Sequence, residues 1–570
     1  MSEPTAKVCR SFALQAAAVA LLAVAAHGSM LARGFVWDDF DLLEPMRLTG
    51  RWDLLAPDPY GFIRPGKALV FSALDAVFGR RAVGWEAFAL ASVILASVLV
   101  LRFAGEFLRP PGPFVAAAVY AAHPLHVEGA GWAAANNGTL LAILALGYYL
   151  ALLRDARVPK PANLAWMTGL FLGALAMKEE AVVLPPIGAL CLWAQRKRPD
   201  RRQAVAMALQ LAAAGVFLFC ARRQAAGAGQ QLEAFPFPAW AMALSAPRTI
   251  LSHMLYFYGP FWWAYFHCFD PRPIAFFSMM GGGLAAAAAL AVWLWRRRER
   301  PTAPLFFILF SVVALLPLSN FIPVGNYVFG VRYLTHSGIG LALLFGWFAL
   351  RAEEAAPRLR PLVRAGLCAW LLAAIFCSNA YHRDWRCNES LFGRMTLDSP
   401  QWRFPYSLGV VRFEQGRGAE AEALFRESLR RSPAQSAPRV ALGMALYREG
   451  NAEEALRLWQ SVEAQEPANI DMALNMAGYY ETKYARSAET ADRDAADRYY
   501  RISAGGRIPN SEAAFVNWGL MWIQQGEMEK AIAIWRAGLK KFPLSQDLAR
   551  NLDLALRRQG PDRPARSAAP

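Results

Sequence analysis

Residues 12–31 read FALQAAAVALLAVAAHGSML, and the acidic segment VWDDFDLL follows at residues 36–43. The first stretch has the length of about 20 residues that a helix needs to cross a bilayer. Asp38, Asp39 and Asp41 are therefore expected at a membrane surface, where an ionisable group is a functional hypothesis by default. A second interpretation is that these acids begin a solvated loop or cap the helix that follows.

The composition is typical of a membrane protein. The chain has 570 residues, 56% of them hydrophobic, which is too long for one globular domain and too apolar for an ordinary soluble one. Its seven cysteines are an odd number without CxxC spacing, so they indicate neither a disulfide framework nor a metal site. The net charge of +16 comes from short basic clusters between apolar segments, which indicates membrane topology and not nucleic-acid binding.

The order of apolar and basic segments predicts the topology. By the positive-inside rule the basic clusters are cytoplasmic, and eleven crossings with the N-terminus inside satisfy every cluster if residues 250–269 do not cross. That segment is broken by Gly259-Pro260 and rich in Trp and Tyr, as re-entrant or interfacial elements are. The predicted crossings are residues 12–31, 84–101, 113–122, 138–153, 163–177, 181–195, 204–220, 274–295, 303–318, 335–350 and 362–380.

This topology places the acidic segment, the turn at His123, the loop at Lys178 and the chain after Ala380 on the same outer face. A cleaved signal peptide is the alternative for the N-terminus, because basic residues precede an apolar stretch that ends in small residues near position 26. Cleavage would leave the sidedness of everything downstream unchanged.

A 34-residue period appears after residue 400 and identifies tetratricopeptide repeats. The step from Pro467 to Pro509 is 42 residues, so the third unit carries about eight extra residues, which we place in residues 482–493. Four units and a last helix over residues 545–557 predict an independently stable solenoid that binds a peptide or protein and carries no chemistry of its own. The repeating positions are Leu408-Gly409, Ala421, Phe425 and Pro433; Leu442-Gly443, Ala455, Trp459 and Pro467; and Trp518-Gly519, Ala531, Trp535 and Pro543.

The predicted fold class is therefore all-α, a polytopic membrane bundle of about 11 transmembrane helices followed by a soluble tetratricopeptide-repeat α-solenoid. We divide the chain into a membrane domain at residues 1–380, a linker at 381–400, a repeat domain at 401–560 and a disordered tail at 561–570.

Six short motifs follow one another along the chain: the acidic pair Asp38-Asp39, Ile63-Arg64-Pro65, His123 to Glu128 (HPLHVE), Lys178-Glu179, Val331-Arg332-Tyr333-Leu334 and Asp384-Trp385-Arg386. With these motifs in this order, the chain resembles the transmembrane and tetratricopeptide-repeat (O-mannosyltransferase-like) family of C-type membrane glycosyltransferases. The resemblance covers nearly the whole chain and implies a sugar on a polyprenyl phosphate, an acceptor hydroxyl and transfer on the extracytoplasmic side. The chain departs from the family at residues 135–138 and at Val331, positions that bear on the sugar and on the finer donor contacts.

The implied reaction needs a base and a cation. A carboxylate that deprotonates the acceptor hydroxyl contributes about 10²–10⁴-fold, and Asp39 or Asp38 is the candidate, with no choice between them from spacing. A guanidinium offers a bidentate fork to the leaving phosphate, so Arg332 and Arg64 are the candidate phosphate ligands, with Lys178 third. Each cation also has a structural interpretation, as a surface turn or as an anchor in the headgroup region.

Four further residues are candidates for substrate binding: His123, His126, Glu128 and Glu179. The two histidines and Glu128 lack the rest of a metal-ligand set, and Pro124 interrupts any helix that would align them, so no metal ligands are predicted. A divalent cation, Mg or Mn, that bridges an Asp to the phosphate stays open. For Glu179, the alternative is that it holds loops together.

Three functions of different classes fit the pattern. The first is a transferase whose repeats present an acceptor protein; the second is a membrane-anchored scaffold for envelope or pilus assembly; the third is a transferase that modifies a glycolipid or polysaccharide. The Ala- and Arg-rich composition suggests a bacterial inner membrane, with the N-terminus cytoplasmic and the repeats periplasmic. The expected partners are the lipid bilayer, a polyprenyl-phosphate-linked sugar and an acceptor protein, and no nucleic acid.

Overall fold

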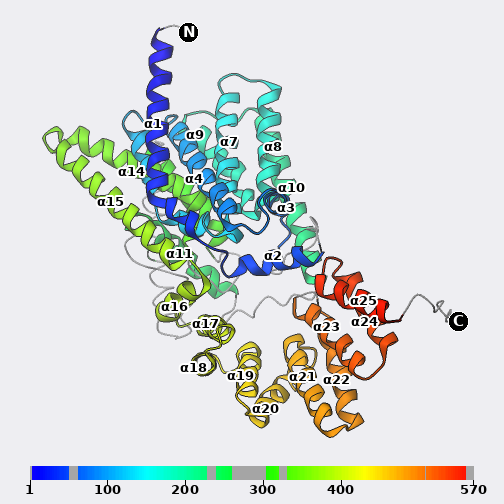
Figure 1. Ribbon diagram of the computed structural model, residues 1–570. Coiled ribbons are helices and arrows are strands. Elements are labelled where there is room, and N and C mark those ends of the chain that lie inside the picture. Colours follow the sequence, from blue (N-terminus) through cyan, green and yellow to red (C-terminus); the bar gives the residue numbers. More distant parts are fainter. Residues whose placement is uncertain are drawn as a thin grey trace. The chain divides into compact units, whose positions relative to one another are not determined.

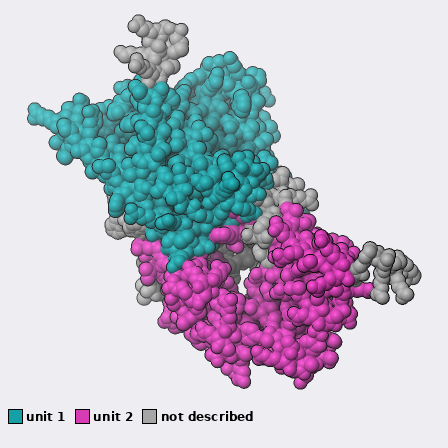
Figure 2. Space-filling model, in the orientation of Figure 1, with its two compact units in different colours: residues 1–39, 53–391 teal, residues 40–52, 392–570 magenta. Residues whose placement is uncertain are grey.

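The computed structural model describes residues 3–49, 62–227, 239–259, 285, 303–319, 330–506 and 509–559 (Figure 1). Every regular element in these ranges is a helix, which confirms the all-α fold class. The chain divides into two compact units, which Figure 2 shows in different colours. The membrane unit comprises residues 1–39 and 53–391, and the repeat unit comprises residues 40–52 and 392–570. The chain thus leaves the membrane unit for the first time directly after Asp39.

Six helical segments of the described chain are long and apolar enough to cross a membrane, and three shorter apolar helices accompany them. The predicted crossing at 274–295 and the second half of the segment 250–269 lie outside the described residues, so the number of crossings stays a prediction. The six segments are Ser11–Ala32, Ala82–Ala104, Ala133–Asp155, Arg201–Ala221, Val331–Ala355 and Pro357–Asp384, and the shorter helices are Gly112–Ala122, Pro161–Met177 and Ala303–Leu318.

The long helices of the membrane unit are joined by short helical turns. The α-helices are α1 (Glu3–His27), α2 (Asp38–Thr49), α3 (Pro65–Phe78), α4 (Ala82–Ala104), α5 (Gly112–Ala122), α6 (Leu125–Gly129), α7 (Asn137–Asp155), α8 (Pro161–Met177), α9 (Leu184–Ala194), α10 (Arg201–Gly227), α11 (Ala239–Tyr258), α13 (Ala303–Leu315), α14 (Leu334–Ala355) and α15 (Arg360–Asp384). The 3-10 turns are η1 (Gly28–Ala32), η2 (Ala133–Ala135), η3 (Glu179–Val183), η4 (Leu316–Leu318), η5 (Val331–Tyr333) and η6 (Pro357–Leu359).

The core of the membrane unit forms around α5 and α14. Nearly every residue of α5 is buried, and small residues let its neighbours come close. A Cβ on Gly346 of α14 would lie 2.6 Å from the carbonyl oxygen of Gly112 at the start of α5. A Cβ on Gly340 would lie 2.6 Å from the carbonyl oxygen of Phe307 in α13. Such close contacts are the usual way in which membrane helices gain packing energy in the absence of a hydrophobic driving force.

The membrane unit has one basic end. Glu106, just after α4, pairs with Arg102 at 2.6 Å and also with Arg157, just after α7. The amide of Gln195, at the end of α9, donates to the backbone oxygen of Glu106 at 2.6 Å. The C-terminal ends of α4, α7 and α9 therefore meet at the same end of the bundle. Consequently, the N-terminal ends of α4 and α7 lie at the opposite end of the bundle, together with the predicted site residues.

The repeat unit is a series of paired helices. After α16 (Asn388–Asp398), these are α17 (Arg403–Glu414), α18 (Gly418–Arg431), α19 (Ser436–Arg448), α20 (Ala452–Glu463), α21 (Ile470–Ser487), α22 (Thr490–Ser503), α23 (Pro509–Gln524), α24 (Met528–Lys541) and α25 (Gln546–Gln559) (Figure 1). Residues 482–487 continue α21, so the insertion predicted in residues 482–493 lengthens helices. The predicted linker, residues 381–400, is mostly helical because α15 continues into it and α16 fills it. The predicted tail lies outside the described residues.

A glycine opposite an aromatic ring recurs in the repeats. A Cβ on Gly443 of α19 would lie 2.5 Å from Nε1 of Trp459 in α20, and one on Gly519 would lie 2.2 Å from the same atom of Trp535. Gly409 faces Phe425 in the same way at 2.6 Å. The periodic Gly and aromatic positions of the sequence therefore pack each helix directly on its partner.

Alanine at Gly443 is expected to destabilise the repeats by about 1–3 kcal/mol, because the Trp459 ring is rigid and must be displaced. Gly478, in α21, is the matched control because a Cβ there meets no atom within 4 Å. Gly478→Ala is expected to stabilise the protein by about 0.5–1 kcal/mol through helix propensity. Hydrogen exchange of the peptides over α19–α21 in the full-length chain measures both, and equal effects of the two variants would contradict this packing.

Candidate functional site

Asp39 is held at the start of α2 by two backbone amides. Its Oδ2 accepts from the N–H of Val36 at 3.0 Å, and its Oδ1 accepts from the N–H of Ala134 at 2.8 Å. The side chain is buried, at 2% exposure, whereas that of Asp38 is half-buried. Asp39 therefore joins the end of the first membrane segment to the turn that precedes α7, 95 residues away.

Burial also changes the acidity of Asp39. Loss of solvation raises the pKa of its carboxyl group to about 7, against the opposing effect of the two backbone hydrogen bonds. The neighbouring Asp38 adds to the increase, and Arg33 opposes it. A carboxyl group with such a pKa exchanges its proton near neutral pH, which suits acid–base chemistry.

Trp132 organises the surroundings of the acidic pair. Its ring is stacked on Trp37, which precedes Asp38, with the centroids 5.4 Å apart and an interplanar angle of 18°. The guanidinium of Arg332 lies 5.4 Å from the centroid of the Trp132 ring, within the range of a cation–π contact. The structure thus brings Arg332, from the turn before α14, to the same end of the bundle as the acidic pair.

Each predicted phosphate-binding cation is paired with a glutamate. Arg64 donates to Glu179 through Nε at 3.0 Å and through Nη2 at 2.6 Å, a bidentate pair. Lys178 pairs with Glu180. Arg332 lies 3.6 Å from Glu128, and its backbone N–H donates to the same carboxylate at 3.3 Å. Glu128 and Glu179, which the sequence predicts as substrate ligands, are therefore ion-pair partners of Arg332 and Arg64, two of the predicted phosphate ligands.

The electrostatics of these glutamates differ. Burial raises the pKa of Glu128, although Arg332 opposes the increase. Burial also disfavours the charged form of Glu179, but Arg64 and Lys178 outweigh it and lower the pKa of Glu179 to about 2. The Arg64–Glu179 pair is consequently ionised at every physiological pH.

The cations lie near one another as well as near the acids. The ammonium of Lys178 lies 5.8 Å from the centroid of the Tyr333 ring, and the guanidinium of Arg332 lies 4.7 Å from the same ring. Arg64 reaches this place through Glu179, the residue next to Lys178. A small pocket adjoins Glu128 and is lined also by Pro124, Val127, Tyr256, Val331, Tyr381 and Trp385.

His123 and His126 are fully buried, with hydrogen bonds to backbone groups. The Nδ1 of His123 accepts from the N–H of Leu125 at 2.9 Å, so its Nε2 must donate to the carbonyl oxygen of Phe257, 3.0 Å away. The ring also stacks on Phe257 at 4.4 Å. The Nε2 of His126 lies 2.9 Å from the carbonyl oxygen of Tyr120. Burial lowers the pKa of each imidazole to about 3, which favours the neutral rings. Their contact with a substrate stays a prediction.

A buried chain of hydrogen bonds that sequence reasoning missed lies beside the acidic pair. Arg33 donates from Nη1 to Nδ1 of His382 at 2.9 Å. Because an arginine side chain can only donate hydrogen bonds, this contact fixes which nitrogen of each histidine donates in the bonds that follow. His382 donates from Nε2 to Nδ1 of His27 at 3.1 Å, and His27 donates from Nε2 to the carbonyl oxygen of Ala121 at 3.1 Å. No local signal in the sequence could reveal it, because His27 and His382 are 355 residues apart.

The described part of the chain offers no ready-made metal site. No three His, Cys, Asp or Glu side chains within it lie close enough together to hold an ion. Both oxygens of Asp39 bind backbone amides, and the nearby glutamates bind cations. The divalent cation that bridges an Asp to the phosphate therefore stays a prediction, and we derive no step through one.

The pKa of Asp39 makes its contribution to stability depend on pH. Between about pH 4 and pH 7 the folded protein holds a proton on Asp39 that the unfolded chain releases, so this contribution falls as the pH rises, by up to about 1.4 kcal/mol per unit. We expect the melting temperature of the wild type minus that of Asp39→Asn to shrink from pH 5 to pH 7 and then level off. Asp41→Asn, at an exposed position of the same helix, is the control, and a difference that grows with pH would contradict the assignment.

The comparisons with known proteins identify the repeats. A family model described as tetratricopeptide repeat matches residues 412–477, which confirms that prediction for this part of the chain. The solved structure of TTC0263, a thermophilic TPR protein of Thermus thermophilus, is 19% identical, with 28% of this chain and 83% of that chain covered and a TM-score of 0.25. No protein of curated function matches the sequence.

Two other solved structures are similar over more of the chain. The archaeal oligosaccharyltransferase AglB from Archaeoglobus fulgidus, solved with an inhibitory peptide and a dolichol-phosphate, is 11% identical over 70% of this chain, with a TM-score of 0.37. This chain covers 59% of the length of that protein. Yeast Tom70 is 12% identical over 83% of this chain and 96% of its own, with a TM-score of 0.20. At these identities and scores, the chemistry of the membrane unit has to be argued from its own residues.

Proposed function

We propose that this protein is a membrane glycosyltransferase of the O-mannosyltransferase-like, tetratricopeptide-repeat kind, which moves a sugar from a polyprenyl phosphate to an acceptor hydroxyl. The proposal rests on one observation. An acidic pair and three cations, each paired with a glutamate, lie at one end of the bundle. Trp132 contacts both Trp37 and Arg332, and so connects the acids with the cations.

The proposed reaction needs only these groups. A sugar phosphate is already activated, so the enzyme must remove a proton from the attacking hydroxyl and stabilise the phosphate that leaves. A carboxylate performs the first task, and fixed cations perform the second in a site with little water. The acceptor oxygen forms a bond to the anomeric carbon, and the bond from that carbon to the phosphate oxygen breaks.

Asp38 is the better candidate for the base. Asp39 is buried, and each of its oxygens already accepts a backbone N–H, so its main task is to hold the loop. Asp38 is half-buried at the first turn of α2, and in the proposed reaction the acceptor hydroxyl meets it there. Asp39 would then hold Asp38 in position and interact with its carboxylate electrostatically.

Arg332 and Arg64 are proposed to hold the donor phosphate, with Lys178 beside them. A glutamate on each of them limits the side-chain motion and keeps the cation at the site when the phosphate is absent. When the phosphate arrives, it shares the guanidinium with that glutamate.

We place the site on the extracytoplasmic face. The basic loops after α4, α7 and α9 cluster at the other end of the bundle, and such loops stay in the cytoplasm. An expected inner-membrane location then gives periplasmic repeats and a cytoplasmic N-terminus. The repeats would present an acceptor protein, since tetratricopeptide repeats bind peptides and proteins on their concave side.

Asp38→Asn tests the proposal directly. Loss of the base should lower transfer by about 10²–10⁴-fold with an unchanged melting temperature, because the substitution keeps the shape of the side chain. The measurement is the glycan mass on envelope proteins of a deletion strain that expresses the variant at the wild-type level. Asp41→Asn, three residues further along the chain and exposed, is the matched control and should restore the wild-type masses.

A scaffold would give the opposite result. If the helices served only as an anchor for the repeats, Asp38→Asn would leave every glycan in place. Transfer at the wild-type rate by this variant would therefore reject the enzyme and favour the membrane-anchored scaffold. An Asp39→Asn variant with a normal fold and no transfer would reverse our assignment of the two acids.

The acceptor class has its own test. Deletion of the protein should remove a fixed glycan mass from one or more envelope proteins, as intact-mass spectrometry measures. Expression of the wild-type chain should restore that mass. An unchanged set of protein masses together with an altered glycolipid or polysaccharide would reject a protein acceptor and support the third function.

A further inference from the structure

The helix α2 belongs to both compact units. It runs from Asp38 to Thr49, and the boundary between the units falls inside its first turn, between Asp39 and Phe40. Asp38 and Asp39 belong to the membrane unit, whereas the rest of the helix belongs to the repeat unit. A segment from the start of the chain is therefore part of the repeat unit, although the first repeat helix, α17, begins only at Arg403.

The last turn of α2 is fixed in the hydrophobic core of the repeats. Leu48 is completely buried and belongs to the same core as Phe542 and Leu548. Its carbonyl oxygen accepts a hydrogen bond from the N–H of Leu544 at 3.0 Å, between α24 and α25 (Figure 1). The last carbonyl groups of a helix have no partner within the helix, and this bond satisfies one of them. Both the side chain and the backbone of Leu48 thus hold α2 on the repeats.

The first repeat helix lies near α2 as well. Burial raises the pKa of Tyr406, in α17, to about 12, and the carboxylates of Asp471 in α21 and Asp41 in α2 add to the increase. Asp41 is therefore close enough to α17 to act on it electrostatically. Leu42 and Leu43, the next two residues of α2, are at most 2% exposed. The helix thus reaches the repeat unit at both of its ends, at α17 and before α25.

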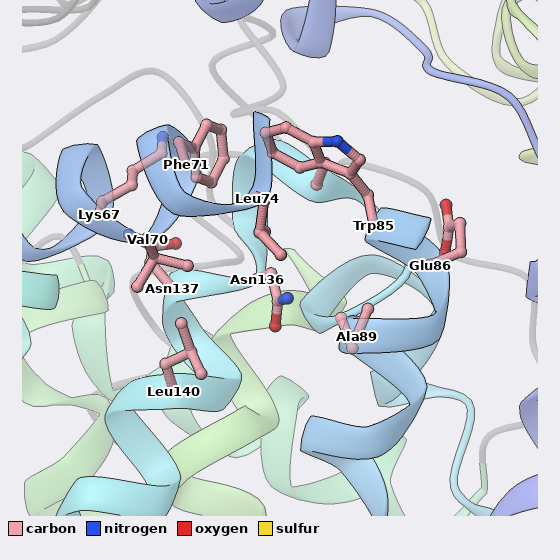
Figure 3. A pocket seen from close by; sticks show the side chains of 12 residues that line it. Lys67, Val70, Phe71, Leu74, Trp85, Glu86, Ala89, Asn136, Asn137 and Leu140 are labelled. Atoms are coloured by element: carbon pink, nitrogen blue, oxygen red, sulfur yellow. The ribbon is translucent and has the colours of Figure 1, made fainter. Parts of the chain in front are cut away.

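The first turn of α2 is fixed in the membrane unit. The carboxylate of Asp39 accepts the N–H of Ala134, in the turn that precedes α7. Two residues further on, Asn136 is 5% exposed, and Figure 3 shows its side chain between Leu74 of α3 and Leu140 of α7. Because protein interiors are close-packed, this turn cannot shift unless α3 and α7 repack. Asp39 therefore binds α2 to a rigid part of the membrane unit.

We propose that α2 couples the repeats to the acidic pair, with Leu48 as a positioning residue that keeps Asp38 in place for the reaction. The inference rests on the proposed function, and it gives the repeats a second task besides the presentation of an acceptor. Asp39 fixes one point of the helix, and the second point, Leu48, fixes its direction. The repeats then set the direction of the helix that carries the base.

The physical basis of the coupling is the stiffness of a helix. Its backbone hydrogen bonds join each turn to the next, so a displacement of the last turn reaches the first turn. A misplacement of a catalytic group by about 1 Å can lower a rate by about 10²-fold, because the reacting atoms leave the geometry of attack. Release of Leu48 from the repeats should therefore slow the transfer, although Leu48 itself touches no reacting atom.

Hydrogen exchange of the full-length chain in lipid nanodiscs tests the docking of α2. The peptides over residues 40–49 should be protected in the wild type. Leu48→Ala leaves a cavity in the core, which should speed the exchange of these peptides at least about tenfold. Leu48→Met keeps the volume and should stay within a few-fold of the wild type. Leu554→Ala, at a position of α25 that is 52% exposed, is the matched control and should leave this exchange unchanged.

Transfer by the same variants in the deletion strain tests the coupling. Leu48→Ala should add glycan mass to envelope proteins at least about tenfold more slowly, while the peptides over α17–α24 keep the exchange of the wild type. Leu48→Met should restore the rate, and Leu554→Ala should transfer like the wild type. If Leu48→Ala unfolds the repeats, Leu48→Val, which leaves a smaller cavity, should show a smaller effect in the same direction.

A helix break separates the coupling from the presentation of an acceptor. Insertion of two glycines after Leu43 leaves Asp39 and Leu48 in place but interrupts the stiff segment between them. The peptides over residues 542–548 should keep their protection, because Leu48 stays docked, and the transfer should still slow at least about tenfold. Transfer at the wild-type rate by this variant would overturn the coupling.

Two further results would contradict the proposal. Unprotected peptides over residues 40–49 in the wild type, or unchanged exchange of these peptides in Leu48→Ala, would overturn the docking. Transfer at the wild-type rate by Leu48→Ala, with α2 released and the repeats folded, would leave Leu48 with a structural role alone.

The coupling and the proposed function can fail separately. If Asp38→Asn loses transfer while Leu48→Ala releases α2 and transfers at the wild-type rate, the transferase stands and the coupling is wrong. If Asp38→Asn itself transfers at the wild-type rate, the assigned chemistry is wrong, and the coupling to that acid is wrong with it. Hydrogen exchange would still decide in that case whether the repeats hold α2.

Discussion

The carboxylate of Asp39 joins two parts of the membrane unit that are far apart in the chain. It is buried, and each oxygen accepts a backbone N–H, one from Val36 and one from Ala134. A buried carboxyl group needs such partners, because an unpaired one would be too costly. This single contact sets the position of the turn before α7, and with it the place of Trp132 on one side and of Asn136 on the other.

Charge pairing explains the rest of the site. A membrane protein can keep cations near the end of its bundle only if they are solvated or paired, since a lone buried charge is expensive. Arg64, Lys178 and Arg332 each have a glutamate, and two of these acids, Glu128 and Glu180, are almost fully buried. The cations are therefore held in place by the fold itself, which in the proposed reaction lowers the reorganisation that a phosphate must cause. The buried histidines contribute by packing and by hydrogen bonds to the backbone.

The repeats are held together by a different principle. Their helices approach until an aromatic ring touches the backbone of the facing helix, and only glycine leaves room for it at Gly409, Gly443 and Gly519. This packing is local, between neighbouring helices, so the sequence carries it as a visible period. The same locality is why residues 482–487 can extend α21 without interrupting the series.

The sequence alone determined the helical class, the apolar segments and the repeats, because each depends on spacing along the chain. It also singled out the acids of the proposed site as a charge cluster after the first apolar segment, and the cations through the resemblance to a glycosyltransferase family. Only the tertiary structure decided which of them touch. Arg64 meets Glu179 and Arg332 meets Glu128 across gaps of 115 and 204 residues. No local pattern encodes such contacts, and for the same reason the Arg33–His382–His27 chain became visible only after folding.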